Sequence, residues 1–268
     1  MSTPMVVAHR GSSAVVAEHT LAAYERAIVD GADGVECDVR LTRDGHLVCV
    51  HDRRLDRTSD GYGLVSERSL DDLDRLDFGR WHDDLPRVAD ELIDPLYRMP
   101  EVASVLTLDE LLGLVVDTDR LVRIFIETKH PNRYAGLVEQ ELVSALRRFG
   151  LADPPDPHQS AATLMSFAPI AVRRMRLLAP AVPKVWLMTS VPPRRRDGSL
   201  PAGVELAGPS VRMLRDTPDY VRRVHSRGHR VYAWTVDADA DVDLVAALGV
   251  DVIATNEPIR VRARLAAP

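Results

Sequence analysis

The stretch Gly34-Val35-Glu36-Cys37-Asp38-Val39-Arg40 predicts a short buried β-strand that carries two carboxylates. Side chains alternate between the two faces of a strand, so the apolar residues share one face and Glu36 and Asp38 share the other. Two acids on one face repel each other and are costly to desolvate, and a divalent cation between them relieves both penalties. The alternative is an edge strand whose acidic face is solvated.

Predicted strands and helices alternate along the rest of the chain. Apolar runs predict strands at 5–9, 34–40, 47–51, 121–127, 163–167, 184–188, 204–207, 230–235 and 251–254. Apolar periodicity predicts helices at 20–28, 107–115, 135–149, 170–178, 219–227 and 241–248. This α/β alternation predicts a parallel sheet, and right-handed crossovers in a chain of 268 residues favour its closure into a TIM (β/α)8 barrel. An open doubly wound sheet is the alternative, but no Gly-x-Gly-x-x-Gly follows the first strand.

Residues 53–105 differ in composition from the rest of the chain. They are rich in Arg, Asp and turn residues and carry several prolines, with only a short helical pattern at 70–76. A segment of about fifty residues makes a marginal independent domain. We therefore predict a single domain over 1–268, with 53–105 as a small insertion after the second barrel strand region.

Bulk composition argues against several classes of protein. The net charge of −6 argues against nucleic acid as the main partner, although a local cluster can still bind a small anion. The two cysteines, Cys37 and Cys49, lie in predicted strands and do not indicate a disulfide framework. No apolar run reaches about 18 residues, and residues 1–10 lack the layout of a signal peptide, so we expect no membrane span and a cytoplasmic location.

Chemically active side chains collect where predicted strands end, which is where the sites of such barrels lie. These residues are His9, Arg10, Glu36, Asp38, His51, Glu127, Lys129 and Trp234. Three carboxylates from two strands make a hard oxygen site suited to Mg²⁺ or Ca²⁺. Two histidines can form a general acid–base pair, and an arginine and a lysine can hold a phosphate.

Each of these residues also has an ordinary structural interpretation. A histidine at a strand end usually makes structural hydrogen bonds, and Trp234 alone is more simply a core residue. Lys129 is more specific, because the chain has only one other lysine, Lys184, and uses arginine for its remaining basic positions. The joint pattern, rather than any single residue, indicates a site.

Several motifs resemble the glycerophosphodiester phosphodiesterase family across nearly the whole chain. The most specific lie in the first 63 residues: His9-Arg10-Gly11, Glu18-His19-Thr20, 31–39, Thr42-Arg43-Asp44-Gly45, His51-Asp52, Arg57-Thr58 and Gly61-Tyr62-Gly63. Looser matches are 76–79, 107–110, 126–129, Ser166-Phe167, 233–236 and 249–251.

The resemblance implies a TIM barrel that cleaves a glycerophosphodiester to glycerol 3-phosphate and an alcohol. It implies metal ligands Glu36, Asp38 and Glu127, acid–base residues His9 and His51, and phosphate contacts from Arg10 and Lys129. We also expect Glu18 and Trp234 to contribute to the substrate or phosphate site. The nucleophile is water or a neighbouring glycerol hydroxyl. We expect His9 to act as the base and His51 as the acid, and we allow for a homodimer.

The chain departs from the family pattern at two places. Ala17-Glu18-His19-Thr20 stands where the family usually has Pro-Glu-Asn-Thr, and Thr255-Asn256-Glu257-Pro258 where it has Thr-Asp-x-Pro. A positive helix dipole disfavours a charged imidazole at a helix start, so we expect His19 to be neutral and to hold Glu18 near Arg10. The change to Asn256 removes a negative charge near the top of the barrel.

Two rival functions use the same residues. A phosphodiesterase for larger lipids, such as a lysophospholipase D or an inositol-lipid phospholipase, should expose apolar side chains in 53–105, where Leu85, Leu92, Ile93, Leu96 and Tyr97 are the candidates. A catalytically silent barrel that binds a phosphorylated metabolite is the rival from another class. The presence of both histidines and all three acids argues against it.

Overall fold

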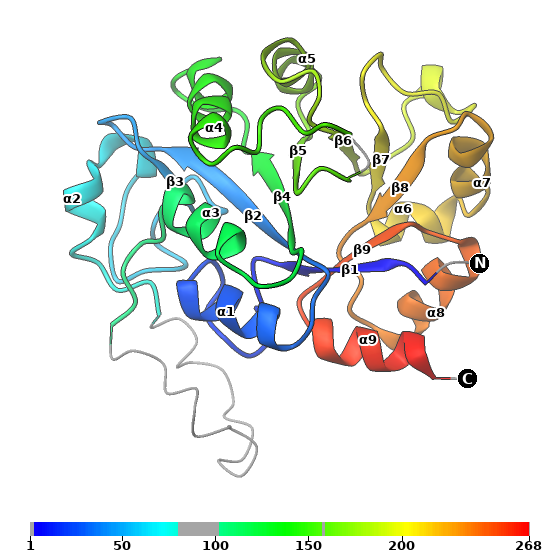
Figure 1. The fold of residues 1–268 in the computed structure, drawn as a ribbon, viewed down its shortest axis with the longest axis horizontal. Coiled ribbons are helices and arrows are strands. Elements are labelled where there is room, and N and C mark those ends of the chain that lie inside the picture. The colour runs from blue at the N-terminus through cyan, green and yellow to red at the C-terminus, as the bar shows by residue number, and fades with distance from the viewer. Residues whose placement is uncertain (1–2, 80–101, 157–158, 268) are drawn as a thin grey trace.

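Eight parallel strands close into a ring in the computed structural model, which describes residues 3–79, 102–156 and 159–267 (Figure 1). They are β1 (Met5–His9), β2 (Gly34–Leu41), β4 (Arg123–Thr128), β5 (Ala162–Ser166), β6 (Lys184–Met188), β7 (Leu206–Pro209), β8 (Arg230–Ala233) and β9 (Val252–Thr255). Strand β1 pairs with β9 on one side and with β2 on the other, and this pairing closes the ring. The predicted TIM barrel is confirmed, and the open doubly wound sheet is wrong.

A ninth strand, β3 (Leu47–Cys49), lies outside the ring and pairs antiparallel with the far end of β2. The Asp44-Gly45 step makes the turn between them, with Gly45 at a φ of 91° that suits glycine. The predicted strand at 47–51 therefore ends two residues early. His51 returns toward the barrel from a hairpin and not from a strand of the ring.

Helices surround the ring of strands (Figure 1). They are α1 (Leu21–Val29), α2 (Leu70–Leu73), α3 (Leu108–Val116), α4 (Leu137–Arg148), α5 (Pro169–Leu178), α6 (Val211–Asp216), α7 (Asp219–Ser226), α8 (Asp239–Leu248) and α9 (Pro258–Ala266), with 3₁₀ turns at Val65–Glu67 and Pro193–Arg195. Thr20 caps α1 by accepting a hydrogen bond from Ala23 N, and Thr107 forms a capping box with Glu110 at α3. The sequence analysis did not predict α6 or α9.

Alternation along the strands separates two apolar layers. Inward-facing side chains such as Val7, Phe125, Val185 and Tyr232 fill the ring, while a larger cluster packs between the strands and the helices. The polar residues of β2 face the inside of the ring, above this filling. The barrel is therefore closed below and open at the end where the strands finish.

The described part of 53–105 has a small apolar cluster of its own against β3. Leu55, Val65, Leu73 and Phe78 pack there with Val48. Residues 80–101 lie outside the described chain, and with them the five apolar residues named for the lipid rival.

Among the described residues, no helix is both long enough and apolar enough to cross a membrane.

Candidate active site

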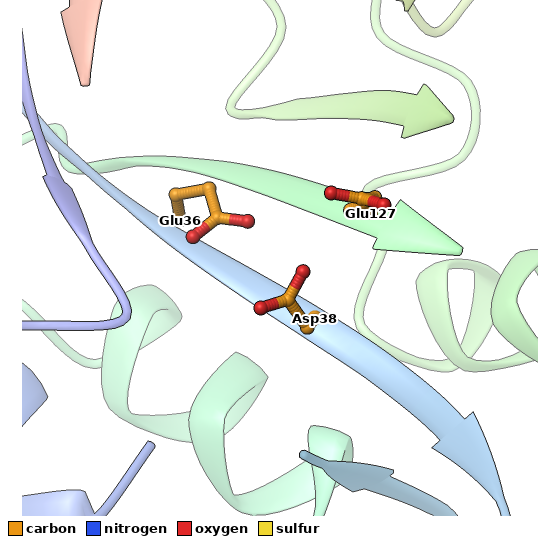
Figure 2. A group of neighbouring side chains, drawn as sticks. All are labelled: Glu36, Asp38 and Glu127. Atoms are coloured by element: carbon orange, nitrogen blue, oxygen red, sulfur yellow. The ribbon is translucent and has the colours of Figure 1, made fainter. Parts of the chain in front are cut away.

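Three buried carboxylates converge inside the ring, from β2 and β4 (Figure 2). Val35 and Cys37 pack outward, so Glu36 and Asp38 point inward, as the strand pattern predicts. The register of β2 on β4 places Asp38 beside Glu127. One oxygen atom of each carboxylate lies within 4.8 Å of the other two.

Asp38 is the most strongly paired of the three acids. Lys129 Nζ lies 3.1 Å from Asp38 Oδ1, and Arg10 Nε lies 3.1 Å from Asp38 Oδ2. His19 Nε2 donates a hydrogen bond of 3.0 Å to Asp38 Oδ2. Burial alone would raise the pKa of Asp38, but the charge of Lys129 and the hydrogen bond from His19 lower that pKa well below its usual range.

The other two acids have less positive charge around them. Burial and the charge of Asp38 raise the pKa of Glu36 well above its usual value. The same causes raise the pKa of Glu127 to about 7, although Lys129 Nζ lies 2.9 Å from Glu127 Oε1. Three converging carboxylate oxygens, two of them on acids with little positive charge around them, are the donor set that a hard divalent cation prefers. The three residues predicted as ligands thus fit a divalent cation.

His9, the last residue of β1, lines the same pocket. Its Nδ1 lies 2.8 Å from Asn256 Oδ1, and its Nε2 lies 4.0 Å from Glu36 Oε2. Burial, helped by the charge of Arg10, lowers the pKa of His9 to about 3. The imidazole is therefore neutral near pH 7.

His51 lines the same pocket and is more exposed than His9. Its Nδ1 lies 2.7 Å from Asp52 Oδ1, and Asp52 Oδ2 accepts a hydrogen bond of 2.6 Å from Arg57 Nε. Burial lowers the pKa of His51, and the charge of Asp38 partly offsets this effect. The two histidines thus differ in their partners, an amide for His9 and a carboxylate for His51.

Glu18 joins the two arginines of the pocket edge. Glu18 Oε1 accepts from Arg10 Nη1 at 3.1 Å and from Arg57 Nη2 at 2.7 Å, while Oε2 accepts from Arg57 Nη1 at 3.0 Å. Burial would raise the pKa of Glu18, but the Arg57 hydrogen bonds and the charge of Arg10 lower it to about 2. Glu18 therefore holds the Arg10 side chain in place.

His19 does not hold Glu18, so that expectation is wrong. The side chain is buried, and its Nδ1 lies 2.7 Å from the Tyr24 hydroxyl while its Nε2 donates to Asp38. Its backbone lies in the left-handed region, with a φ of 60°. Burial lowers the pKa of His19, in agreement with the expected neutral imidazole.

An apolar wall completes the pocket, whose empty volume is ≈ 490 Å³ including its open mouth. Phe167 and Trp234 meet edge to face at a centroid distance of 5.2 Å, and Trp234 Nε1 donates to Gly208 O at 2.7 Å. Met165, Leu187 and Tyr232 also line the pocket. Trp234 thus stands beside the charged groups, where the sequence analysis expected it.

Sequence reasoning missed several partners of the predicted residues. Asp52 was quoted only as the neighbour of His51, and Arg57 only as part of a motif. Asp237 was not noticed at all, yet its Oδ2 accepts 2.8 Å from Asn256 Nδ2. Asn256 itself carries no negative charge, but it is hydrogen-bonded to a carboxylate, that of Asp237.

Comparisons with known proteins agree on one family. The model of the glycerophosphoryl diester phosphodiesterase family matches residues 9–260. A probable glycerophosphodiester phosphodiesterase 1 of Mycobacterium tuberculosis is 49% identical over 98% of this chain and 92% of its own length. A glycerophosphodiester phosphodiesterase of Bacillus subtilis is 31% identical over 95% of this chain and 84% of its own length.

Solved structures share the fold. A crystal structure of a putative glycerophosphoryl diester phosphodiesterase from Silicibacter pomeroyi covers 98% of this chain and 93% of that chain, with a TM-score of 0.80 and 24% identity. A phosphodiesterase of Oleispira antarctica, solved in complex with the product sn-glycerol-3-phosphate, covers 99% and 98% with a TM-score of 0.76 and 23% identity.

Proposed function

The chain belongs to the glycerophosphoryl diester phosphodiesterase family, and on this premise we propose that it is a metal-dependent enzyme that hydrolyses glycerophosphodiesters to glycerol 3-phosphate and an alcohol. One observation carries the proposal. A single pocket is lined by two histidines, two cationic side chains and two of three converging buried carboxylates, and Asp38, the third, lies within 4.8 Å of the other two. Hydrolysis of a phosphodiester uses each kind of group: a metal ion held by carboxylates and cationic side chains to neutralise the phosphate charge, and histidines for the two proton transfers.

Glu36, Asp38 and Glu127 would hold a divalent cation, Mg²⁺ or Ca²⁺, because their donors are all carboxylate oxygens. When bound, that cation supplies Lewis-acid polarisation of a phosphate oxygen. Arg10 and Lys129 line the pocket beside the acids and would bind the phosphate charge. Glu18 orients Arg10, and Trp234 bounds the space left for the glycerol or the alcohol.

The two histidines would divide the proton transfers. His9, neutral and held by an amide, takes the proton of the attacking hydroxyl, whether of water or of the neighbouring glycerol carbon. The new bond joins that oxygen to phosphorus, and the bond from phosphorus to the alcohol oxygen breaks. His51, paired with the Asp52 carboxylate, donates a proton to the departing alcohol oxygen. An attack by the glycerol hydroxyl forms a cyclic phosphate, which water then opens.

Release of glycerol 3-phosphate from glycerophosphocholine, followed with Mg²⁺, Ca²⁺ and Mn²⁺ in turn, tests the proposal. A metal-dependent rate in wild type supports it, and no release with any metal contradicts it. His9→Ala and His51→Ala should each lower kcat by at least about 10², the low end for an acid–base group. Full activity in either variant would remove that histidine from the mechanism.

Further properties extend the proposal. We propose that residues 1–268 act as one domain with 53–105 inserted, and a panel of glycerophosphodiesters should identify the preferred alcohol. A cytoplasmic location fits the two buried free thiols, Cys37 and Cys49, and cell fractionation tests it. Exposed Ile170 and Leu177 on α5 support the proposed homodimer, which light scattering tests.

A further inference from the structure

Asp237 follows β8 and is not among the residues that line the pocket. Within the described part of the chain, its side chain has no hydrogen bond to His9 or His51. Its carboxylate accepts three hydrogen bonds from the two residues that end and follow β9. Oδ1 accepts from Thr255 Oγ1 at 2.9 Å and from Asn256 N at 2.8 Å. Oδ2 accepts from Asn256 Nδ2 at 2.8 Å. Asp237 therefore accepts hydrogen bonds from both the backbone N–H and the side-chain amide of Asn256.

The hydrogen bond from Asn256 Nδ2 to Asp237 Oδ2 permits only one orientation of the Asn256 side-chain amide. An ionised carboxylate can accept hydrogen bonds but cannot donate them. If the amide turned over, its oxygen would face Asp237 Oδ2 at hydrogen-bond distance with no proton between them. Asn256 Oδ1 must therefore point the other way, toward His9 and Ser13.

The orientation of Asn256 in turn fixes the tautomer of His9. Asn256 Oδ1 lies 2.8 Å from His9 Nδ1 and, as an acceptor, requires that nitrogen to carry a proton. Ser13 Oγ lies 2.8 Å from the same oxygen and 2.8 Å from His9 O, and its single proton can be donated to either acceptor. In the neutral ring the lone pair is then left on Nε2, the nitrogen that faces Glu36 and the pocket.

We propose that Asp237 is a positioning residue, which acts through the amide of Asn256 to hold His9 as the Nδ1–H tautomer with a basic Nε2 facing the pocket. The proposal rests on the proposed function only for the use of that Nε2 as a base. The tautomer itself is a property of the protein without substrate. A histidine free to adopt both tautomers would present a proton, rather than a lone pair, in part of its population.

Nitrogen-15 NMR of the histidine rings tests the proposal directly, with and without added Mg²⁺. The His9 signals are assigned as those missing from His9→Gln. Wild type should show a protonated Nδ1 and an unprotonated Nε2 for His9. A protonated Nε2 with a bare Nδ1 in wild type would overturn the proposal at once, whatever the enzyme's activity.

Asp237→Asn is the informative variant, because an amide at position 237 can donate and so releases the orientation of Asn256. His9 should then show both tautomers, and kcat should fall by roughly 10- to 100-fold, the usual loss when the partner of a functional histidine is removed, with little change in KM. Asp239→Asn is the matched control, since Asp239 pairs with Arg260 at the surface two residues away. It should change neither the tautomer nor kcat.

The exchanged pair, Asp237→Asn combined with Asn256→Asp, separates positioning from general structural damage. A carboxylate at 256 can only accept from His9, and the amide at 237 can donate to it. This double variant should restore the single His9 tautomer and most of kcat. An Asp237→Asn protein that keeps both the tautomer and the rate, or an exchanged pair that fails to recover either while its melting curve is normal, contradicts the proposal. Loss of all glycerol 3-phosphate release in wild type would contradict the proposed function and leave the tautomer result intact.

Discussion

Glu18 shows how a single buried acid links stability to pH. Its folded pKa of about 2 lies below the ordinary value of 4.5, because hydrogen bonds from Arg57 and the charge of Arg10 outweigh burial. A depressed folded pKa stabilises the protein fully above pH 4.5, and this stabilisation is lost as the pH falls toward 2. The melting temperature of Glu18→Gln should therefore be lower than that of wild type near pH 7, and the two should converge in acid.

Thermal melts of both proteins from pH 2 to 7 check this prediction. Asp56→Asn is the control, because Asp56 pairs with Arg54 in an exposed position where such a pair contributes little. A difference between Glu18→Gln and wild type that does not narrow below pH 4.5 would count against the assigned pairing.

His19 contacts a proposed metal ligand rather than substrate. Replacing it with asparagine, which also tolerates a φ of 60°, removes the hydrogen bond to Asp38 without straining the turn. In His19→Asn, kcat should change by less than about tenfold. The metal concentration for half-maximal activity should rise by roughly tenfold, the low end for loss of a ligand's partner.

Metal titrations and pH–rate profiles of His19→Asn measure both effects. Tyr24→Phe is a matched control, since it keeps the bond from His19 to Asp38 and removes the hydroxyl on the other side of the imidazole, together with that hydroxyl's hydrogen bond to Glu36 O. If His19→Asn loses a titrating limb that wild type shows near neutral pH, His19 takes part in the chemistry.

For single residues, the sequence predicted the side chains that point into the barrel but not the residues that hydrogen-bond to them. Strand alternation and the positions of strand ends predict where Glu36, Asp38 and Glu127 point. The contacts of His19 with Asp38, and of Asp237 with Asn256, depend on a backbone angle and on the spacing of two neighbouring strand ends. Neither quantity can be inferred from residue type.

The turn that follows β1 positions Arg10 and packs directly on α1. Gly11 has a φ of 83°, and a Cβ there would lie 2.6 Å from the backbone of Ala23. Gly45, in the β2–β3 turn, has a φ of 91°, but a Cβ at that position would have no atom within 4 Å. Gly45→Ala should thus cost only about 1–2 kcal/mol for its backbone angle, and Gly11→Ala roughly 2–5 kcal/mol, because overpacking adds to it.

Urea unfolding of the two variants measures these free energies. Equal losses of stability would mean that the contact with α1 adds nothing and that backbone angle alone matters. We also expect Gly11→Ala, but not Gly45→Ala, to weaken activity, since only the first turn carries Arg10.

Most elements could be predicted, and those that could not have physical reasons. Buried parallel strands have long apolar runs, which the sequence shows clearly. Helix α6 has six residues, too few for a periodic pattern, and α9 has arginines between its apolar positions. The early end of β3 follows from its place outside the ring, where pairing with β2 stops at Cys49.

Barrel closure was predictable from the alternation and the length, but the pairing of β3 with β2 outside the ring was not. Strand β2 pairs with β1 and β4 in the ring and with β3 beyond it, so it alone belongs to both the barrel and the hairpin. A cation held by Glu36, Asp38 and Glu127 would tie β2 to β4. We therefore expect metal binding to stabilise the entire barrel.

The melting temperature of wild type should rise when Mg²⁺ is added, by the equivalent of about 2.7 kcal/mol at 100 times the dissociation constant. Glu127→Ala should lose most of this shift. Asp109→Asn, which alters an exposed pair with Arg148 far from the ring interior, should keep it. The same shift in all three proteins would exclude Glu127 as a ligand.

The placement of the two lysines has a practical consequence for chemical labelling. Lys184 is fully buried, while Lys129 lines the pocket between two carboxylates that raise its pKa against the effect of burial. Of the two lysines, Lys129 is thus the one that a small acylating reagent can reach, and alkaline conditions will be needed to expose its free base. Because Lys129 lines the proposed phosphate site, incorporation of one tag at this residue should rise as activity falls, so that a mass spectrum would count inactivated molecules while the 32 arginines stay unmodified.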